Sequence, residues 1–533
     1  MGGSSAANEP VRAAEIIAAA CLATDLGMGF PFEHGLRGTL MAMRLAERLD
    51  VDAATTSQTF YTSLLMYAGC TTDSDVAGRI FAGSRTDNVT PVQFGSPAEA
   101  VAGLIRSLPA PGEPPHRRAY AVARRVVPAG RFMRPHFAAL CEVAEMMAKR
   151  LGLPPEVHTL FVHLTERWDG KGLLRRAEGE EISLPLRIVH VARDAAYQRM
   201  IVGDDHAVEV VRRRSGRAFD PRVARRFVQD APEIMAAADE PDSAWEAALA
   251  AEPEPRLTLD SADVDRALAA IGDFADLVSP DLSGHSGGVA ELASAAARIC
   301  GMDPSEVAHV RRTAFVHDLG RVAVSPRIWQ KPAGLTLDEW EQVRLHPYHT
   351  ERVLLRSGFL ASLADAACAH HERLDGTGYH RRLAAAALPE GVRLLAAADA
   401  FHAMCAPRPH RRGLPPKAAA EELGEEARAG RLDSRMVAAV IEAAGQETPQ
   451  IERPAGLTER EAEVMGLVAR GLQTKQVARQ LGISTKTADR HIQNSYRKIG
   501  VSTRAAATLF AMEHGLLPPQ GRPGPQPEPH PSR

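Results

Sequence analysis

The sequence predicts a mainly α-helical protein: two tandem, related all-α domains, the first of them degenerate, followed by a small helix-turn-helix bundle. Apolar residues recur every three or four positions over most of the chain, as in residues 36–49 and 289–301, and convincing two-residue alternation is absent. Part of the first region recurs in the second. Residues 456–516 carry the glycine and capping signals of short, closely spaced helices.

Composition bounds the possible functions. The chain has 533 residues, 45% of them apolar, which is enough for several hydrophobic cores. A formal net charge of −3 excludes a uniformly basic nucleic-acid binder, so any such contact must come from a local patch. The six cysteines form no CxxC pair, which favours reduced thiols. No apolar run is long enough to cross a bilayer and no secretion signal is evident, so we expect a cytoplasmic protein without a membrane partner.

Shifts in composition divide the chain at acidic or proline-rich stretches. The expected parts are a first domain (1–228), an acidic linker (229–261), a second domain (262–445), a short linker (446–455), the helix-turn-helix bundle (456–516) and a disordered, proline-rich tail (517–533).

The first region looks like a diverged copy of the second. Residues 163–172 (HLTERWDGKG) echo residues 369–378 (AHHERLDGTG). From His34 to Met66 is 32 positions, the same separation as from His285 to His317. The first copy also carries about 45 extra residues between Met66 and Leu164, which we interpret as a lid or a docking element.

The second region contains an ordered series of imidazoles and carboxylates on helical segments: GHSGGVAELA, AFVHDLGRVAVS, RLHPYHTERVL, AHHERLDGTGYH and LLAAADAFHAM. Histidine and aspartate together suit divalent ions such as Fe, Mn or Zn. The adjacent pair His317 and Asp318 allows one carboxylate to bridge two metals. Two metals about 3.5–4 Å apart favour in-line attack on a phosphate ester without a protein nucleophile.

From about Pro280 to Met404 this pattern resembles the HD-GYP family, metal-dependent phosphohydrolases of the HD superfamily that cleave cyclic di-GMP. The resemblance implies two divalent metal ions, Fe or Mn with Zn as an alternative, and a cyclic dinucleotide or related phosphoester as ligand. It implies the metal ligands His285, His317, Asp318, His346, His370, His371 and Asp399, together with Asp281 where family members often have Glu.

Two positions depart from the family pattern. Arg321 stands where the family has a phosphate-binding lysine, and His380 replaces the proline of the GYP signature. Arg321 keeps a positive charge for a phosphate, whereas His380 weakens the inference of a guanine-nucleotide substrate. We expect Glu372, Asp375, Gly378 and Tyr379 to orient the loop and its ligand histidines without binding metal themselves. We interpret His349, His402 and His410 as surface or capping histidines.

In the register of the repeat, the first copy has lost its ligand set. The corresponding positions hold Met66, Tyr67, Leu164, Thr165 and Arg193, and only His34 remains. One imidazole cannot assemble a divalent site, so we expect no metal in this copy. Its role is left open between binding an effector and holding the second copy in place.

The C-terminal region has helix-turn-helix punctuation. Thr458 and Glu461 have capping-box spacing, Gly471 closes the first helix, and Gly482 makes the turn after a short helix over 475–481. Ser484 can cap a longer helix that runs to about Ile499. Nine Lys or Arg against five acidic residues over 456–516 give a local positive charge that attracts phosphates.

This region resembles the LuxR-type family, whose members bind double-stranded promoter DNA, commonly as homodimers. The match implies DNA contacts by Lys486, Thr487, Arg490, His491, Asn494 and Lys498, and a dimerising helix from Arg504. Ser495 stands where an aliphatic residue is usual. The alternative is an ordinary basic bundle used for protein contacts.

Three hypotheses for the whole chain stay open, and the third keeps only the enzyme and treats the helix-turn-helix as a dimerisation or protein-docking module. The first is a transcriptional regulator whose LuxR-type domain is controlled by a binuclear-metal phosphodiesterase domain, with cyclic di-GMP as the implied substrate. The second is a non-catalytic transcription factor whose HD-like domains bind metal and a signal nucleotide as a sensor, Arg321 and His380 marking lost activity. Turnover of the nucleotide discriminates between the first two.

Overall fold

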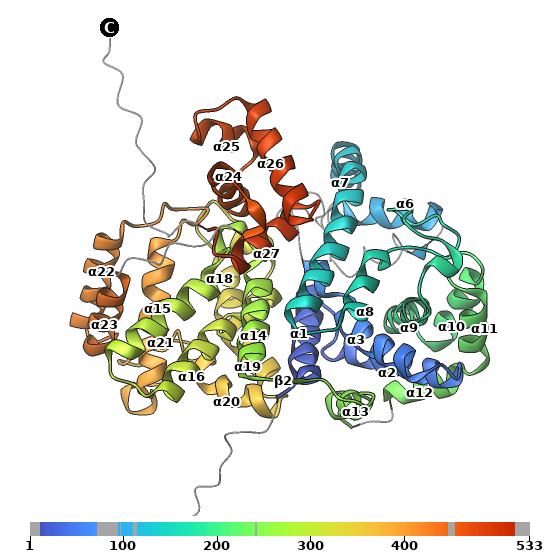
Figure 1. Ribbon diagram of the computed structural model, residues 1–533, viewed down its shortest axis with the longest axis horizontal. Coiled ribbons are helices and arrows are strands. Elements are labelled where there is room, and N and C mark those ends of the chain that lie inside the picture. The colour runs from blue at the N-terminus through green and yellow to red at the C-terminus, as the bar shows by residue number, and fades with distance from the viewer. Residues whose placement is uncertain are drawn as a thin grey trace, which may run out of the picture.

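The computed structural model describes residues 11–71, 94–95, 97–109, 114–239, 242–445 and 454–517. Within these residues the chain is helical apart from two very short strands, so the predicted mainly α class is confirmed. Two helical lobes lie side by side, and the C-terminal helices rise from one face of the molecule (Figure 1).

The first lobe is built from α-helices joined by short 3₁₀ turns. Its elements are β1 (Val11–Arg12), α1 (Ala13–Met28), α2 (His34–Arg48), α3 (Ala53–Leu65), η1 (Ala68–Thr71), α6 (Pro97–Ser107), α7 (Pro115–Arg150), α8 (Pro155–His158), η2 (Thr159–His163), η3 (Gly179–Glu181), α9 (Leu184–Ile201), α10 (Asp204–Arg214), α11 (Pro221–Gln229), α12 (Ala231–Asp239) and α13 (Ala244–Ala250).

The second lobe and the C-terminal bundle follow. The second lobe has β2 (Thr258–Leu259), α14 (Ser261–Asp276), η4 (Pro280–Leu282), α15 (His285–Ile299), α16 (Pro304–Val316), η5 (Leu319–Ala323), α17 (Pro326–Trp329), α18 (Leu337–Arg344), α19 (His346–Leu354), α20 (Gly358–Cys368), η6 (Ala385–Ala387), α21 (Glu390–Cys405), α22 (Pro416–Arg428) and α23 (Ser434–Ala444). The bundle has η7 (Pro454–Gly456), α24 (Glu459–Ala469), α25 (Thr474–Gln480), α26 (Thr485–Ile499) and α27 (Arg504–Glu513).

The two lobes share a local device that shows the repeat in three dimensions. Asp25 at the end of α1 accepts hydrogen bonds from the backbone N–H of Gly35 at the start of α2. Asp276 at the end of α14 accepts the equivalent bond from Ser286 at the start of α15. Both helix starts follow a residue in the left-handed region, Glu33 in one lobe and Gly284 in the other. Equivalent aspartates, Asp25 and Asp276, therefore fix the starts of the equivalent helices α2 and α15.

The lobes are joined through a continuous apolar core. α1 is buried on all sides and packs against η5 and α19 of the second lobe, as an apolar helix between two layers does. Ahead of α1, β1 pairs antiparallel with β2, so that Val11 lies opposite Leu259. The start of the chain is thus bound to the start of the second lobe.

The segment 229–261, predicted as an acidic linker, is largely helical and packed. It contains α12, α13 and β2, and both helices pack on α2. Ser243 caps α13, and Trp245 is fully buried. The alanines and leucines between the acidic residues have helical spacing and supply this apolar face. Of the other predicted joints, residues 446–453 and the tail from 518 lie outside the described residues.

No described helix combines the length and the hydropathy that a membrane span requires. The extra segment of the first copy is only partly described and includes α6 and the long helix α7. The C-terminal half of α7 contacts η1 and η2 of its own lobe and α14 of the second lobe.

Candidate metal centre and nucleic-acid interface

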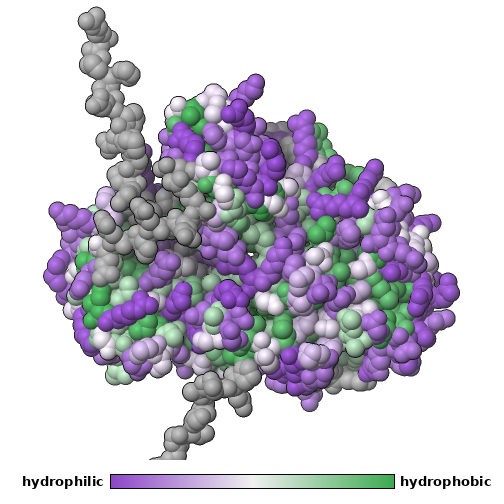
Figure 2. All heavy atoms as spheres, in the orientation of Figure 1, coloured by the Kyte–Doolittle hydropathy of each residue, from purple (hydrophilic) through white to green (hydrophobic). Residues whose placement is uncertain are grey.

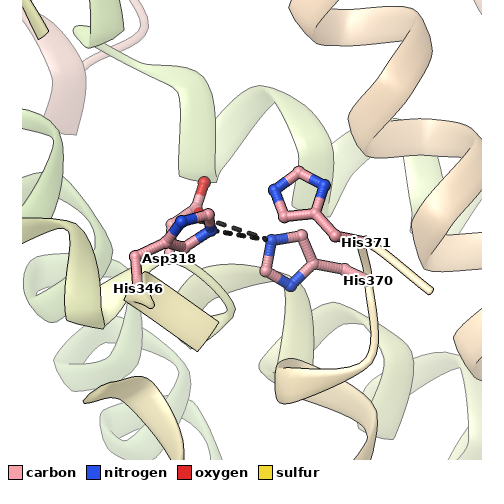
Figure 3. Close-up of side chains that lie close together, drawn as sticks. All are labelled: Asp318, His346, His370 and His371. Carbon is pink, nitrogen blue, oxygen red and sulfur yellow. Dashed lines mark hydrogen bonds and ion pairs between the residues drawn. The ribbon is translucent and has the colours of Figure 1, made fainter. Parts of the chain in front are cut away.

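The predicted ligands of the second lobe come together in two groups that share Asp318. One group is Asp318, His346, His370 and His371 (Figure 3), and the other is His285, His317, Asp318 and Asp399. Oδ1 of Asp318 lies 3.1 Å from His346 Nε2 and 3.4 Å from His370 Nε2. Its Oδ2 lies 2.8 Å from His317 Nε2 and 3.3 Å from His285 Nε2. Each carboxylate oxygen therefore faces a different group.

Three of the imidazoles are oriented by the backbone. Nδ1 of His317, His346 and His370 lies 2.6–2.7 Å from the carbonyl oxygen three residues earlier, in Ala314, Val343 and Ala367. A carbonyl only accepts hydrogen bonds, so Nδ1 carries the proton and donates it. In the neutral form of each ring the Nε2 lone pair then faces Asp318, which is the orientation and tautomer of a metal-ligating histidine.

His402 orients a fourth ring, which corrects its interpretation as a surface histidine. Its Nδ1 lies 3.0 Å from His285 Nδ1, while His285 Nε2 lies 3.0 Å from Asp399 Oδ1. Gly288 of α15 makes this approach possible, because a Cβ there would lie 2.1 Å from His402 Nε2. The sequence signal was present: His402 follows Asp399 by three residues on α21 and so lies on the same face.

The two groups are held in register by a close crossing of η5 and α19. A Cβ on Gly320 would lie 2.0 Å from the carbonyl oxygen of His346, so the crossing requires glycine. The N–H of Gly320 donates to Thr350 Oγ1, and the Thr350 hydroxyl donates to the carbonyl of His317. Ligands from α16, η5 and α19 are thereby fixed relative to one another.

Arg321 is buried beside the shared carboxylate. Its Nη2 lies 2.5 Å from Asp318 Oδ2, and its guanidinium lies over the ring of Trp329. Within the described residues, its Nε and Nη1 are buried without a hydrogen-bond partner. A planar group with free donors at this position suits an anion that carries several oxygens.

The loop after His371 is organised by Glu372. Its carboxylate accepts hydrogen bonds from the backbone N–H groups of Arg381, Arg382 and Leu383. Gly378 crosses this segment so closely that a Cβ would lie 2.4 Å from Glu372 Cα. The predicted supporting role of Glu372 and Gly378 thus has a geometric basis.

The remaining loop residues have different roles. The Tyr379 ring stacks on His371 with centroids 4.6 Å apart. Asp375 is exposed and accepts hydrogen bonds from Thr377, which closes a local turn. His380 Nε2 lies 3.4 Å from Glu351 Oε2, and His380 belongs to neither ligand group.

Asp281 does not join the other predicted ligands. It belongs to neither group, and its backbone carbonyl accepts a hydrogen bond from Arg408. Burial raises the pKa of its carboxyl, although the Arg408 charge opposes the shift. The residue lies on η4, before the helix start that aims His285.

Charge and burial set the protonation states of the centre. Burial acts to raise the pKa of Asp318, but the charges of Arg321 and His317 lower it further than burial raises it. The pKa of Asp318 is therefore well below its usual value. Burial lowers the pKa of His346 to about 4 and that of His371 well below its usual value. Burial also acts to lower the pKa of His317, but Asp318 and Asp399 raise it to about 10. At neutral pH Asp318 is therefore charged and His346 and His371 are neutral, which are the forms that bind metals, whereas His317 is protonated and must lose that proton to bind one.

In the first lobe, the position that corresponds to the metal centre holds the positively charged side chain of Arg193. Met66, Tyr67, Leu164, Thr165 and Arg193 are all buried there, and the guanidinium of Arg193 lies 4.1 Å from the centre of the Tyr67 ring. Burial and the Arg193 charge lower the pKa of His34 to about 4. Across the described residues, both ligand groups lie in the second lobe.

The C-terminal bundle has the predicted helix-turn-helix form. Thr458 and Glu461 make a capping box, and Ser484 accepts a hydrogen bond from the N–H of Thr487. Ala488, Ile492 and Ser495 form the buried face of α26. The Ser495 hydroxyl donates to the carbonyl of His491, which explains how a polar residue occupies this apolar position.

The predicted DNA contacts differ in their surroundings. Lys486 and Arg490 are exposed, and Thr487, His491 and Asn494 are half-buried. Lys498 instead has partners inside the bundle, because its Nζ lies 2.7 Å from Glu461 Oε2 and 3.0 Å from the carbonyl oxygen of Gly456. Sequence reasoning gave no sign of this ion pair.

The helix predicted to dimerise is covered by its own chain. α27 packs against α7 and α14, and Ala505, Ala506 and Leu509 are buried. At its start, the Glu142 carboxylate on α7 accepts hydrogen bonds from the backbone N–H groups of Ser502 and Thr503. In this arrangement the predicted dimer surface faces the first lobe.

The bundle also touches the segment that leads into the metal centre. In the loop between α14 and α15, the Ser283 hydroxyl donates to the carbonyl of Ala469, and the Gly284 N–H donates to Met512 Sδ. Pro280 lies so close to Gly471 that a Cβ on that glycine would be 2.6 Å from it. His285 begins α15 directly after this contact.

Comparisons with known proteins agree with this architecture. A family model described as an HD domain matches residues 270–436, and a model of the luxR family of bacterial regulatory proteins matches residues 455–511. The 3'3'-cGAMP-specific phosphodiesterase 3 of Vibrio cholerae is 28% identical over 408 residues, which are 75% of this chain and 88% of that protein. A cyclic di-GMP phosphodiesterase of Thermotoga maritima is 35% identical over 152 residues, 28% of this chain and 41% of that protein.

A solved structure shares the fold of the two lobes. The crystal structure of a cyclic GMP-AMP-specific phosphodiesterase of V. cholerae superposes with a TM-score of 0.57 at 23% identity. The match covers 83% of this chain and 99% of that one. The two family models thus place an HD domain at residues 270–436 and, C-terminal to it, a domain of the luxR family of bacterial regulatory proteins at residues 455–511.

Proposed function

We propose that the chain is a transcriptional regulator in which a metal-dependent phosphodiesterase, acting on a 3',3'-linked cyclic dinucleotide, is coupled to promoter DNA binding. The observation that carries the enzymatic part is the shared carboxylate of Asp318, whose two oxygens face two separate groups of ligands. We assign one divalent ion to each group, with Fe or Mn preferred for a mixed histidine and carboxylate set and Zn as an alternative.

The chemistry of the residues fits two cations. Within the described residues, His317 Nε2 and both Asp318 oxygens are buried without a properly formed hydrogen bond, although they approach each other closely. Buried polar atoms without partners are costly, and cations at the two groups would satisfy them. The backbone bonds that fix the histidine tautomers leave lone pairs directed to the same places.

The side chains around the centre divide the work of a phosphodiester cleavage. When bound, the metals would neutralise phosphoryl oxygens and activate water for in-line displacement. Arg321 would use its free Nε and Nη1 to hold a phosphoryl oxygen beside Asp318. Tyr379, stacked on His371, would place an aromatic ring next to the ligand where a nucleobase can stack.

The relatives support the choice of substrate class. The V. cholerae relative is specific for 3'3'-cGAMP and the T. maritima relative acts on cyclic di-GMP. His380 pairs with Glu351 and belongs to neither ligand group, so both groups are complete without the proline of the GYP signature. We propose a cyclic dinucleotide with two 3',5' linkages, and turnover of 3'3'-cGAMP against cyclic di-GMP decides between the two nucleotides.

The regulatory part of the proposal rests on the loop before α15. This loop contacts the bundle at Ala469 and Met512 and ends at His285. If metal or ligand binding moves His285, the loop before it would move too and would change its contacts with α24 and α27. The first lobe, with Arg193 in place of a ligand, would act as a scaffold that holds α27 through Glu142.

The direct test uses the full chain, stripped with chelator and reloaded with Mn²⁺, Fe²⁺ or Zn²⁺. We expect about two ions per chain, as a binuclear site requires, and conversion of 3'3'-cGAMP or cyclic di-GMP to its linear dinucleotide. Two bound ions without turnover of either nucleotide would refute the catalytic assignment and favour the sensor hypothesis.

His402 gives a second test that is specific to one ligand group. His402→Ala is expected to weaken metal binding at the group containing His285 by about 10- to 100-fold, the usual effect of removing a partner of a ligand. His402→Asn, which keeps an acceptor for His285 Nδ1, should recover part of the loss. His410→Ala, on an exposed histidine, is the control. Equal metal affinity in His402→Ala and the control would refute the orienting role.

A further inference from the structure

The N-terminal half of α7, residues 115–136, is strongly basic, and we name it the basic arm. It contains six arginines and neither aspartate nor glutamate. The rest of the helix, from residue 137 to Arg150, has mixed charges and packs on its own lobe and on α27. The C-terminal half of α7 thus packs against the rest of the protein, whereas its N-terminal half carries the positive charge.

The charges of the basic arm are available to a partner. Arg117, Arg118, Arg124, Arg131 and Arg134 are exposed, and none of them pairs with a carboxylate of the described chain. Arg117, Arg124 and Arg131 recur at seven-residue intervals, so they share one stripe of the helix, about 21 Å long at 1.5 Å per residue. Among the arginines of the arm, Arg125 is the one with a bond to the described part of the chain, which it donates to the carbonyl oxygen of Leu108.

The arm lies beside the DNA-binding bundle. Glu142, one and a half turns beyond the arm on the same helix, holds the start of α27. Figure 1 shows the N-terminal part of α7 rising from the same face as α26, and Figure 2 shows hydrophilic side chains gathered over the bundle on that face. Lys486 and Arg490 of α26 are exposed as well. The arm and α26 are thus two positive surfaces held close together, and the arm has no carboxylate that would neutralise it. A bound polyanion would relieve the repulsion between these two surfaces.

We propose that the basic arm is a second DNA-binding surface, which contacts backbone phosphates beside the site that α26 occupies. A row of arginines without acidic neighbours matches a phosphate backbone and carries no sequence preference. The inference rests on DNA binding by the C-terminal domain, and it adds a contact from the first lobe, outside that domain.

An anionic membrane is the other polyanionic partner that such a helix could meet, since Tyr120 and Val127 are also exposed. The observations favour DNA, because the arm is anchored to the bundle by Glu142 and shares its face. Vesicle binding is therefore included as an outcome of the test.

The test compares three variants of the full chain on a duplex selected from a random DNA pool by the wild-type protein. The arm variant is Arg117→Gln, Arg124→Gln and Arg131→Gln together. The charge-matched control is Arg217→Gln, Arg222→Gln and Arg225→Gln, three exposed arginines in and before α11, on the opposite side of the first lobe. Arg490→Ala reports on α26. Affinity is measured by fluorescence anisotropy over a series of salt concentrations, and vesicles of phosphatidylglycerol and phosphatidylcholine are tested by flotation.

Loss of three phosphate contacts should make the slope of log K against log salt shallower by about 2.7, with about tenfold weaker binding at moderate salt. The control should bind as wild type does. If the arm variant matches the control while Arg490→Ala weakens binding, the arm inference is wrong and the proposed function survives. If neither weakens binding, both are wrong. Loss of vesicle binding with unchanged DNA affinity would assign the arm to a membrane instead.

Discussion

Replacing Asp318 with asparagine is expected to remove nearly all metal from the full chain and to lower phosphodiesterase turnover by at least about 10³-fold, since each bound metal contributes several kcal/mol of transition-state stabilisation. Asp318 is the residue on which both ligand groups converge, one through each oxygen. The neutral amide keeps the size of the side chain but loses the charge that balances two cations.

Metal content and turnover are measured on the same preparation. Asp365→Asn is the matched control, because Asp365 lies in the same lobe and its side chain is 91% exposed. An Asp318→Asn protein that retains two metals and hydrolyses the nucleotide at the wild-type rate would rule out the bridging role.

Replacing Arg490 with alanine is expected to weaken binding to the selected duplex by about 1–3 kcal/mol, or roughly 5- to 150-fold, as loss of a base contact does. Arg490 is exposed on α26 and has no ion-pair partner in the described chain, so its removal leaves the fold of the bundle unchanged. Anisotropy titration measures the affinity, and the melting temperature confirms that the variant is folded. Wild-type affinity in Arg490→Ala would remove α26 from the interface.

Lys498→Ala provides the contrast. Lys498 is bound to Glu461, and that ion pair, followed by the hydrogen bonds from Thr458, holds the pKa of Glu461 at about 2. A folded-state pKa below the usual value means that the pair stabilises the bundle above the ordinary glutamate pKa and loses this effect as the pH falls towards 2. We expect Lys498→Ala to lower the melting temperature of the bundle at neutral pH, with a salt slope of DNA binding equal to that of wild type.

Much of the site could be predicted from the sequence because its residues lie in long, ordered motifs. The two groups gather the seven ligands that the family resemblance implies, and the adjacent pair His317 and Asp318 alone allowed one carboxylate to serve two metals. The capping signals of Thr458 and Ser484 are local, so the helix starts of the bundle were predicted as well. The loss of ligands in the first lobe followed from register alone.

Other features depend on contacts between distant segments. His402 touches His285 across 117 positions, and Lys498 reaches Glu461 across 37, so the partner of neither residue has a local signal, although His402 shares a helix face with Asp399. Asp281 has the right chemistry and lies close to His285 in sequence, yet η4 places it outside both groups. The segment 229–261 was misjudged because its acidic residues hide an apolar helical face that packs on α2.

The most direct test of the account is whether the DNA-binding domain responds to the metal centre. The affinity of the full chain for the selected duplex is measured after chelator treatment and after reloading with Mn²⁺, for wild type and for Asp318→Asn. Contact between the loop before His285 and the bundle predicts that Mn²⁺ changes the wild-type affinity by about 5- to 150-fold, the usual range of coupling between sites, and leaves Asp318→Asn unchanged. Identical wild-type affinity in the two states, with metal shown to be bound, would contradict the account.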